Sequence, residues 1–395
     1  MATVELALQV LTGAEATAHA MRQIQPDVVP VYPITPQTPI IQTFSRFVAD
    51  GKADTVIVQV ESEHSAMSAA VGSALAGART MTATASQGLA LMVEVIYIAA
   101  GLRAPIVIAV GNRALSAPIN IHGDHSDGML ARDSGAVQIY AQDAQEAYDL
   151  MVMAPRIAEH PDVMLPVMVG QDGFQVTHSA EGVALLPDPD VRDFVGPYEI
   201  PNPLLGGGAS SHGTFAMPDS YFELRHQLVQ ATEAAEAVYA EVAQDYRRRF
   251  GRDLPQIDAY RMEDAERAIL LIGSAAGTAK EVVDDLRAEG ERVGLVALRL
   301  YRPFPHAALR AALAGARRVA VLDRAVSPGA YPPLYSDALG ALQGSATTLQ
   351  SYVYGLGGRD LSQRAVRRAF AELALPAADR IGYLGLGGED GDGEP

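Results

Sequence analysis

The sequence lacks cysteine and tryptophan altogether, and it holds fewer basic residues than acidic ones. Without cysteine, the chain can form no disulfide, no thiolate zinc site and no iron–sulfur cluster of its own. Its 30 Lys and Arg residues against 47 Asp and Glu residues give a formal net charge of −17 at pH 7. That charge argues against a surface that binds nucleic acid or anionic membranes in general.

Long uninterrupted hydrophobic runs are also missing. The most apolar stretch, from Leu89 to Val110, contains Glu94, Arg103 and Pro105, which a membrane-spanning helix would tolerate poorly. A buried helix followed by a buried strand accounts for this stretch better. The N-terminal residues show no basic region followed by a long apolar run, so no export signal is expected. These absences predict a cytoplasmic protein without a membrane span.

The 395 residues, of which 49% are apolar, suffice for two domains that each bury a core. Between about residues 28 and 169, short runs of β-branched and apolar residues alternate with helical stretches. This alternation predicts a parallel sheet that is covered by helices on both faces. The predicted strands are DVVPVY, TVIVQV, RTMTATA, APIVIAV, AVQIYA and LPVMVG.

Two different kinds of sequence follow this unit: a Pro- and Gly-rich segment with a long helical stretch, and then a second strand–helix–strand unit. Residues 185–218 are rich in Pro and Gly and predict an extended, irregular arm, and a long helical stretch follows from Asp219. A second strand–helix–strand unit begins near Ala265. Its turn GSAAGT lacks the full dinucleotide-binding fingerprint, which favours tight packing of helix on strand over nucleotide binding. The sequence thus predicts an α/β fold of two parallel-sheet domains, at 1–184 and 261–380, joined by an arm and linker helix at 185–260 and followed by an acidic tail at 381–395.

Unusual polar residues follow four of the predicted strands in the first unit. If those strands are parallel, their carboxyl ends share one edge of the sheet, which is where open α/β sheets bind ligands. Each residue also has a structural explanation, because Thr35 could cap a turn, Glu63 would suit a helix start, and Arg113 could be a surface charge. The residues at the four strand ends are Thr35; Glu61, Glu63 and His64; Ser86 and Gln87; and Asn112 and Arg113.

The loop that follows the fourth of these strands contains GDHSD and raises the question of a metal site. Its potential ligands all lie within six residues, and side chains so crowded more often form local hydrogen bonds. The sequence therefore predicts no metal site on this chain. The potential ligands are His122, Asp124, His125 and Asp127.

Three separated motifs resemble those of the 2-oxoacid:ferredoxin oxidoreductases, in particular the α subunit of multi-subunit pyruvate:ferredoxin oxidoreductases (pyruvate synthases). The motifs occur in the order and at the spacing of that family. The resemblance extends through GLVALRLYRPFP and VLDRAVSPGAYPPLY and covers nearly the whole chain except the acidic tail. The three motifs are YPITPQTPI, VESEHSAMSAAVGSALAGARTMTATASQGLALM and NRALSAPINIHGDHSDGMLARDSG.

The resemblance implies a thiamine diphosphate enzyme in which this chain supplies the pyrimidine-side domain and a transketolase C-terminal-like domain. It implies a β subunit that supplies the diphosphate and Mg²⁺ side and a [4Fe–4S] cluster, with a γ subunit and a ferredoxin-like δ subunit beside it. The implied reaction is oxidative decarboxylation of pyruvate to acetyl-CoA and CO2, with coenzyme A as co-substrate and ferredoxin as electron acceptor. A chain without cysteine would need such partners to carry electrons.

The resemblance also implies roles for single residues. Glu63, in preference to Glu61, matches the family's carboxyl group that bonds pyrimidine N1′ of thiamine diphosphate. That contact promotes the imino tautomer of the cofactor, in which the cofactor's own amino group removes the proton from C2. Arg113 matches the arginine that binds the substrate carboxylate, and a guanidinium fork suits that group. Thr35 matches the threonine beside substrate and cofactor. The other residues implied to line the cavity are Ser86 and Gln87 on the cofactor side and Gly123, Asp124 and His125 on the substrate side.

One position departs from the family's pattern. Pyruvate enzymes of the family often carry Cys just before DHSD, where this chain has Gly123. The same chemistry on phenylglyoxylate, a branched-chain oxo acid or 2-oxoglutarate is therefore the first alternative, and a non-catalytic scaffold subunit is the second. A transketolase-like enzyme is disfavoured, because the chain has no diphosphate motif of the GDG…N type.

Overall fold

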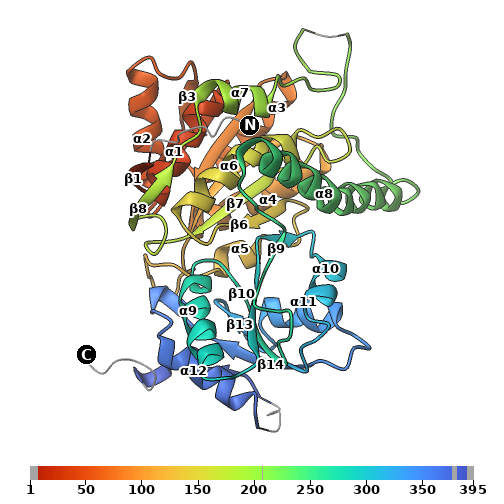
Figure 1. Cartoon of the computed structure of the whole chain (residues 1–395). Coiled ribbons are helices and arrows are strands. Elements are labelled where there is room, and N and C mark those ends of the chain that lie inside the picture. The colour runs from red at the N-terminus through yellow and green to blue at the C-terminus, as the bar shows by residue number, and fades with distance from the viewer. Residues whose placement is uncertain (1–7, 207, 376–379, 389–395) are drawn as a thin grey trace.

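The computed structural model describes residues 8–206, 208–375 and 380–388. It contains two large sheets and a two-stranded ribbon. Figure 1 shows the N-terminal half of the chain in the upper part of the molecule and the C-terminal half, in cyan and blue, below it. The predicted α/β fold with two mainly parallel sheets is confirmed.

The first sheet has seven strands in the order β12-β6-β7-β5-β4-β2-β3. All six predicted strands are present, and neighbours among them pair in parallel. The seventh, β12 (Leu300–Arg302), comes from the C-terminal half and pairs antiparallel with β6 at the sheet edge. The six parallel strands are β2 (Val28–Val31), β3 (Val56–Gln59), β4 (Thr80–Thr84), β5 (Ile106–Asn112), β6 (Val137–Tyr140) and β7 (Val167–Asp172).

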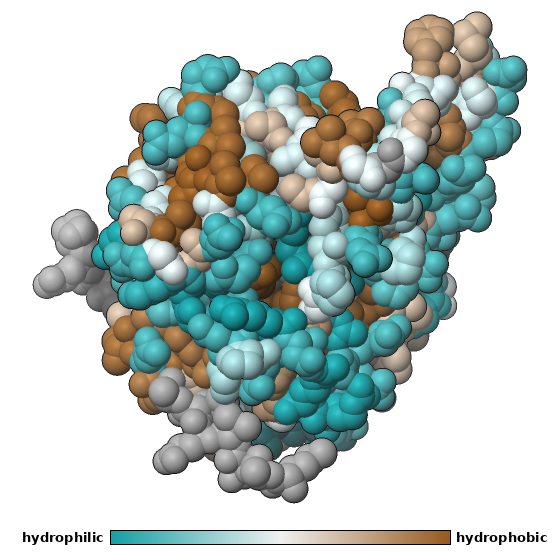
Figure 2. Space-filling model, turned by 90° about the horizontal axis from the view of Figure 1, so that it is seen from above, coloured by the Kyte–Doolittle hydropathy of each residue, from teal (hydrophilic) through white to brown (hydrophobic). Residues whose placement is uncertain are grey.

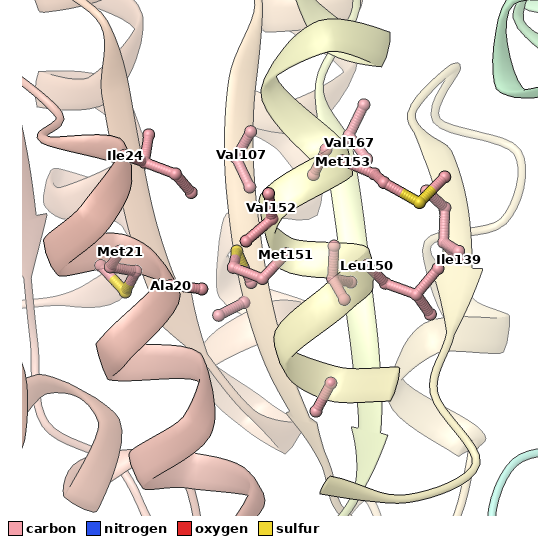
Figure 3. Close-up of a cluster of buried hydrophobic side chains, with 14 of the residues drawn as sticks. Ala20, Met21, Ile24, Val107, Ile139, Leu150, Met151, Val152, Met153 and Val167 are labelled. Atoms are coloured by element: carbon pink, nitrogen blue, oxygen red, sulfur yellow. The ribbon is translucent and has the colours of Figure 1, made fainter. Parts of the chain in front are cut away.

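Helices cover both faces of the first sheet, because its central strands are apolar on both sides. On one face α1 (Gly13–Ile24), α2 (Thr38–Ala49) and α6 (Ala144–Ala158) form a core with the strands. Figure 3 shows α1, with Met21 and Ile24, beside α6, with Leu150, Met151 and Val152, on this face of the sheet. On the other face α3 (Glu63–Ala76) and α4 (Ser86–Gly101) form a separate cluster.

The apolar stretch from Leu89 to Val110 is the buried helix and strand that the sequence predicts. It covers most of α4 and the start of β5. Among the described residues, no helix combines the length and the apolar character that crossing a bilayer requires.

The second sheet has six strands in the order β15-β14-β13-β10-β11-β9. Of the predicted turn GSAAGT, only Gly273 and Ser274 connect β10 to α9 (Ala275–Ala288), and the other four residues form the start of that helix; Gly273 has a positive φ of 80°. Three further helices flank the sheet: α10 (His306–Ala312), α11 (Pro333–Ala341) and α12 (Gln363–Glu372). Five strands are parallel, β10 (Arg267–Ile272), β11 (Val293–Leu298), β13 (Arg318–Asp323), β14 (Thr348–Val353) and β15 (Gly382–Tyr383), and β9 (Ile257–Tyr260) is antiparallel at the edge.

The connection between the two sheets is less irregular than predicted. Residues 185–218 contain α7 (Asp188–Val195), which begins after Pro187 with a second proline in its first turn, a position that helices accept. Between α7 and α8 (Tyr221–Phe250), the described residues form no helix or strand. The helix α8 ends at the left-handed Gly251, and its start extends outward from the body of the molecule (Figure 1).

Two further features near the ends of the chain were not part of the prediction. Near the N-terminus, β1 (Leu8–Thr12) pairs antiparallel with β8 (Ala180–Ala184). Near the C-terminus, the predicted acidic tail begins with β15, and residues 389–395 of that tail lie outside the described residues.

Candidate active site

Four loops meet at the carboxyl-terminal edge of the first sheet. Strands β3, β2, β4 and β5 are neighbours in that order and run parallel, so the residues that follow them lie along one edge. This is the position at which open α/β sheets bind ligands.

Glu63 is the first residue of α3, where the helix dipole favours a carboxylate. The helix starts there because the Ser62 side chain caps it, accepting a hydrogen bond from the Ser65 backbone N–H at 3.2 Å. The Glu63 side chain is buried and lies against Gly88 of α4, where an added Cβ would stand 2.6 Å from Glu63 Oε1. By contrast, Glu61 is exposed and accepts a hydrogen bond from Ser65 Oγ. The geometry therefore favours Glu63 over Glu61 as the buried carboxyl group of the site.

The surroundings of Glu63 fit the pyrimidine ring of thiamine diphosphate. No group in the described part of the chain donates a hydrogen bond to the Glu63 carboxyl group. Across Gly88 from it, the hydroxyl of Thr84 is buried and also lacks a partner there. Buried polar groups normally have hydrogen-bond partners, so a polar ligand from outside the chain would complete this pair. A ring nitrogen that bonds a carboxyl group meets that need.

Arg113 follows β5 and is 7% exposed. Its Nε donates to Asn120 O and its Nη1 donates to Thr35 O, each at 2.9 Å. Within the described residues no carboxylate pairs with this guanidinium, and burial lowers its pKa. Burying an unpaired cation is costly, and the free part of a guanidinium fork matches a carboxylate. The site is therefore suited to an anionic ligand beside Arg113.

Thr35 lies close to Arg113, as predicted, but the contact uses its backbone carbonyl. The residue is exposed, so its hydroxyl remains available to a ligand. The preceding residues are stiffened by prolines, and the Thr35–Pro36 bond is cis. Gly111 of β5 packs on this segment, since a Cβ there would lie 3.3 Å from Pro36 Cγ.

Asp127 joins two of the loops. Its carboxyl group accepts hydrogen bonds from the backbone N–H of Ser86 (2.8 Å), Arg113 (3.0 Å) and Gly128 (2.7 Å), and from Asn112 Nδ2 (2.9 Å). Burial raises the pKa of Asp127 to about 6, against the lowering effect of these hydrogen bonds. The carboxylate thus fixes the backbone at both Ser86 and Arg113.

Ser86 and Gln87 are the first residues of α4, and the Ser86 hydroxyl has partners within the chain. It lies 2.5 Å from Ala114 O and 2.6 Å from Gln87 Oε1, and Ser86 is fully buried with a positive φ of 48°. In this structure Ser86 holds the α4 start against the β5 loop. Contact with a cofactor from this pair stays a prediction.

The three residues predicted to line the substrate side have close contacts within the chain, and their contact with a substrate stays a prediction. His125 Nε2 lies 2.6 Å from Asp172 Oδ1, and Asp124 Oδ1 accepts from Ser126 N at 2.9 Å. An added Cβ at Gly123 would stand 2.6 Å from Gly173 O. The backbone of Gly173 therefore occupies the space that a cysteine side chain at position 123 would need.

The potential metal ligands of this loop have separate partners. Asp127 faces Asn112 and backbone N–H groups, whereas His125 faces Asp172. Across the described part of the chain, no three His, Cys, Asp or Glu side chains gather into a set that could hold a metal ion.

Two residues of the site had no distinct role in the sequence-based prediction. Gly88, which permits the close approach of Glu63, directly follows Ser86 and Gln87, and a glycine at a helix start could have signalled it. Asn120, which accepts from Arg113, had no local signal.

Comparison with known proteins agrees with this geometry. Residues 19–244 match the family described as "Pyruvate flavodoxin/ferredoxin oxidoreductase, thiamine diP-bdg", and residues 265–366 match "Pyruvate:ferredoxin oxidoreductase core domain II". The chain is 52% identical over 384 residues to pyruvate synthase subunit PorA of Thermotoga maritima, covering 95% of this chain and 97% of the relative. It is 40% identical to ketoisovalerate oxidoreductase subunit VorA of Pyrococcus horikoshii, covering 92% and 93%.

Solved structures share the fold at low sequence identity. A 2-oxoglutarate:ferredoxin oxidoreductase from Magnetococcus marinus superposes with a TM-score of 0.72 and 20% identity, covering 93% of this chain and 65% of that one. A split-gene transketolase superposes with a TM-score of 0.51 and 12% identity, covering 92% and 94%. With the sequence matches, these findings show that the chain belongs to the pyruvate flavodoxin/ferredoxin oxidoreductase family.

Proposed function

We propose that this chain is the α subunit of a thiamine-diphosphate-dependent pyruvate:ferredoxin oxidoreductase. The observation that carries the proposal is a buried, unpaired Arg113 on the same sheet edge as a buried Glu63 whose carboxyl group has no donor within the described residues. The relatives at 52% and 42% identity are named pyruvate synthase subunits, which supports pyruvate as the substrate.

Each residue of the site would do one task. Glu63 would hold the pyrimidine ring through N1′ and share a proton with it. Arg113 would bind the carboxylate of the oxo acid, and Thr35 would offer its hydroxyl beside the reacting carbon. Thiamine diphosphate supplies the carbanion chemistry when bound, so the chain contributes orientation and charge.

The remaining parts of the machine would come from other subunits. We propose a β subunit with the Mg²⁺ and diphosphate side and a [4Fe–4S] cluster, and γ and ferredoxin-like δ subunits, with coenzyme A as acyl acceptor and ferredoxin as electron acceptor. The absence of cysteine supports this division, because the chain cannot hold a cluster through thiolates. The complex would be cytoplasmic, with the chain divided as predicted at 1–184, 185–260 and 261–380.

Exposed apolar side chains also support assembly with partners. The segment before α8 and the start of that helix expose Phe215 at 89% and Phe222 at 78%. The face seen in Figure 2 carries separate brown apolar patches among hydrophilic residues. Large exposed apolar groups of this kind mark surfaces that partners bury.

Substrate choice is tested with the complex co-expressed from its subunits. Pyruvate should give the highest kcat/KM for coenzyme-A-dependent reduction of ferredoxin among pyruvate, ketoisovalerate, 2-oxoglutarate and phenylglyoxylate. A higher value for ketoisovalerate would favour the branched-chain alternative, to which the VorA relative points. Failure of the complex to bind thiamine diphosphate in calorimetry would favour the scaffold alternative.

Arg113→Ala tests the carboxylate site. Losing a charge-assisted hydrogen bond should raise the KM for pyruvate on the order of 10- to 100-fold and leave the Kd of thiamine diphosphate nearly unchanged. Arg132→Ala is the matched control, because it removes the same side chain from a residue that pairs with Asp133. An unchanged KM in Arg113→Ala would end the proposed role of this residue.

A further inference from the structure

The loop that carries Arg113 is held by a loop of the second sheet. We call residues 113–125, after β5, the substrate loop, and residues 355–358, after β14, the glycine loop. Asn120 Nδ2 donates to Gly357 O at 3.1 Å, and Gly357 N lies 3.4 Å from Asp124 Oδ2. Gln175, just after β7, donates from Nε2 to Gly358 O at 3.1 Å. The glycine loop therefore contacts the substrate loop near both its middle and its end.

The approach of the two loops requires glycine. An added Cβ at Gly357 would stand 2.5 Å from Asn120 Nδ2, and one at Gly358 would stand 2.3 Å from His122 Cβ. Both glycines have positive φ, 62° and 84°, which other residues adopt at a cost. Backbone of the second sheet thus touches side chains of the substrate loop with no room between them.

Asn120 connects this contact to Arg113. Its backbone carbonyl accepts from Arg113 Nε at 2.9 Å, while its side chain donates to Gly357 O and accepts from His122 N at 2.6 Å. The other anchor of the guanidinium is Thr35 O, on a proline-stiffened segment. A shift of Asn120 would therefore turn Arg113 about its contact with Thr35.

We propose that the glycine loop of the second sheet is a positioning element for the substrate: through Asn120 it sets the orientation in which Arg113 meets the carboxylate. The inference rests on the proposed function, since it takes Arg113 as the carboxylate-binding residue. It gives the C-terminal half of the chain a part in substrate binding through its contact with Asn120. Misplacing a binding group by about 1 Å can cost a large factor in rate or affinity.

Gly357→Ala in the assembled complex is the first test. It should raise the KM for pyruvate by about five-fold or more, with kcat within about two-fold of wild type and an unchanged Kd for thiamine diphosphate. Gly344→Ala is the matched control. Gly344 also has a positive φ, 78°, in the same half of the chain, but nothing lies within 4 Å of its added Cβ. The control carries the same backbone penalty without the contact, so it should keep the wild-type KM.

Asn120→Asp is the second test and does not depend on Gly357→Ala folding. The aspartate keeps the oxygen that accepts from His122 N. It replaces the Nδ2 group that donates to Gly357 O with a second oxygen, which cannot donate and faces that carbonyl. The KM for pyruvate should rise as in Gly357→Ala. A wild-type KM in both variants, with a raised KM in Arg113→Ala, would overturn the positioning role and leave the proposed function intact. A wild-type KM in Arg113→Ala would overturn the proposed function and this inference together.

Discussion

At the scale of single residues, the buried polar groups of the site differ in how many hydrogen bonds they make within the chain. Asp127 accepts four hydrogen bonds, while the Glu63 carboxyl group accepts none from the described residues. Arg113 donates two hydrogen bonds to backbone carbonyls, and its other N–H groups donate none to the described residues. Asp127, whose hydrogen-bonding capacity is filled within the chain, stabilises the loops of the site. Under the proposed function, a ligand would complete the hydrogen bonding of Glu63 and Arg113.

Asp127 predicts a dependence of substrate binding on pH. Its pKa, raised by burial to about 6, means that the carboxylate form exists above about pH 6 and is lost below it. The protonated form carries a donor toward the N–H groups of Ser86 and Arg113, which should loosen both loops. The KM for pyruvate should therefore rise as pH falls through about 6, measured by steady-state kinetics on the complex.

The variant Asp127→Asn gives the control for that pH dependence. Its amide places a permanent donor among the same N–H groups. The KM for pyruvate should therefore be raised at every pH, and it should no longer rise further as the pH falls below about 6. If the KM of Asp127→Asn depended on pH as the wild-type KM does, Asp127 would be excluded as the origin of that pH dependence.

At the scale of elements, apolar runs were sufficient to predict the six parallel strands of the first sheet, because each is a short run of β-branched and apolar residues. Four of these strands, β4, β5, β6 and β7, are buried throughout, whereas the edge strand β3 is partly exposed. Pairing between distant segments could not be predicted: β12 joins the first sheet from the other half of the chain, and β1 pairs with β8. The helix α7 was missed because its prolines resemble those of a loop. Asn120 was missed for a similar reason, since its partner Gly357 lies 237 residues away.

The core between α1 and α6 gives a prediction of stability. Leu150 of α6 is fully buried in this cluster (Figure 3), so Leu150→Ala should lower the free energy of unfolding by about 2–5 kcal/mol. Leu339→Ala in α11, where the side chain is 50% exposed, should change it by about 0.5 kcal/mol or less. Urea denaturation followed by circular dichroism compares the two, and equal losses would contradict the assignment of this core.

At the scale of the whole molecule, Asp172 links the two halves of the chain. This residue ends β7 of the first sheet and contacts His125, Arg324 Nη1 at 2.9 Å, and both the N–H and hydroxyl of Ser274 in the second half. Burial alone would raise its pKa, but the neighbouring His125 and Arg324 hold the pKa well below the ordinary value.

Removing this link should destabilise the protein strongly. Asp172→Ala leaves the buried Arg324 guanidinium without its carboxylate, which should cost about 3–5 kcal/mol and lower the melting temperature of the chain. Asp285→Ala, which breaks a surface pair with Arg367, should leave that temperature nearly unchanged. Similar melting temperatures for the two variants would show that the link does not hold the halves together.

The most direct test of the account is turnover by the assembled complex with Glu63→Gln, beside Glu61→Gln as control. The glutamine keeps the size of the side chain but cannot share a proton with the pyrimidine ring. We predict that Glu63→Gln retains its subunits and loses turnover on the order of 100-fold or more, while Glu61→Gln stays near wild type. Wild-type turnover in Glu63→Gln would contradict the account.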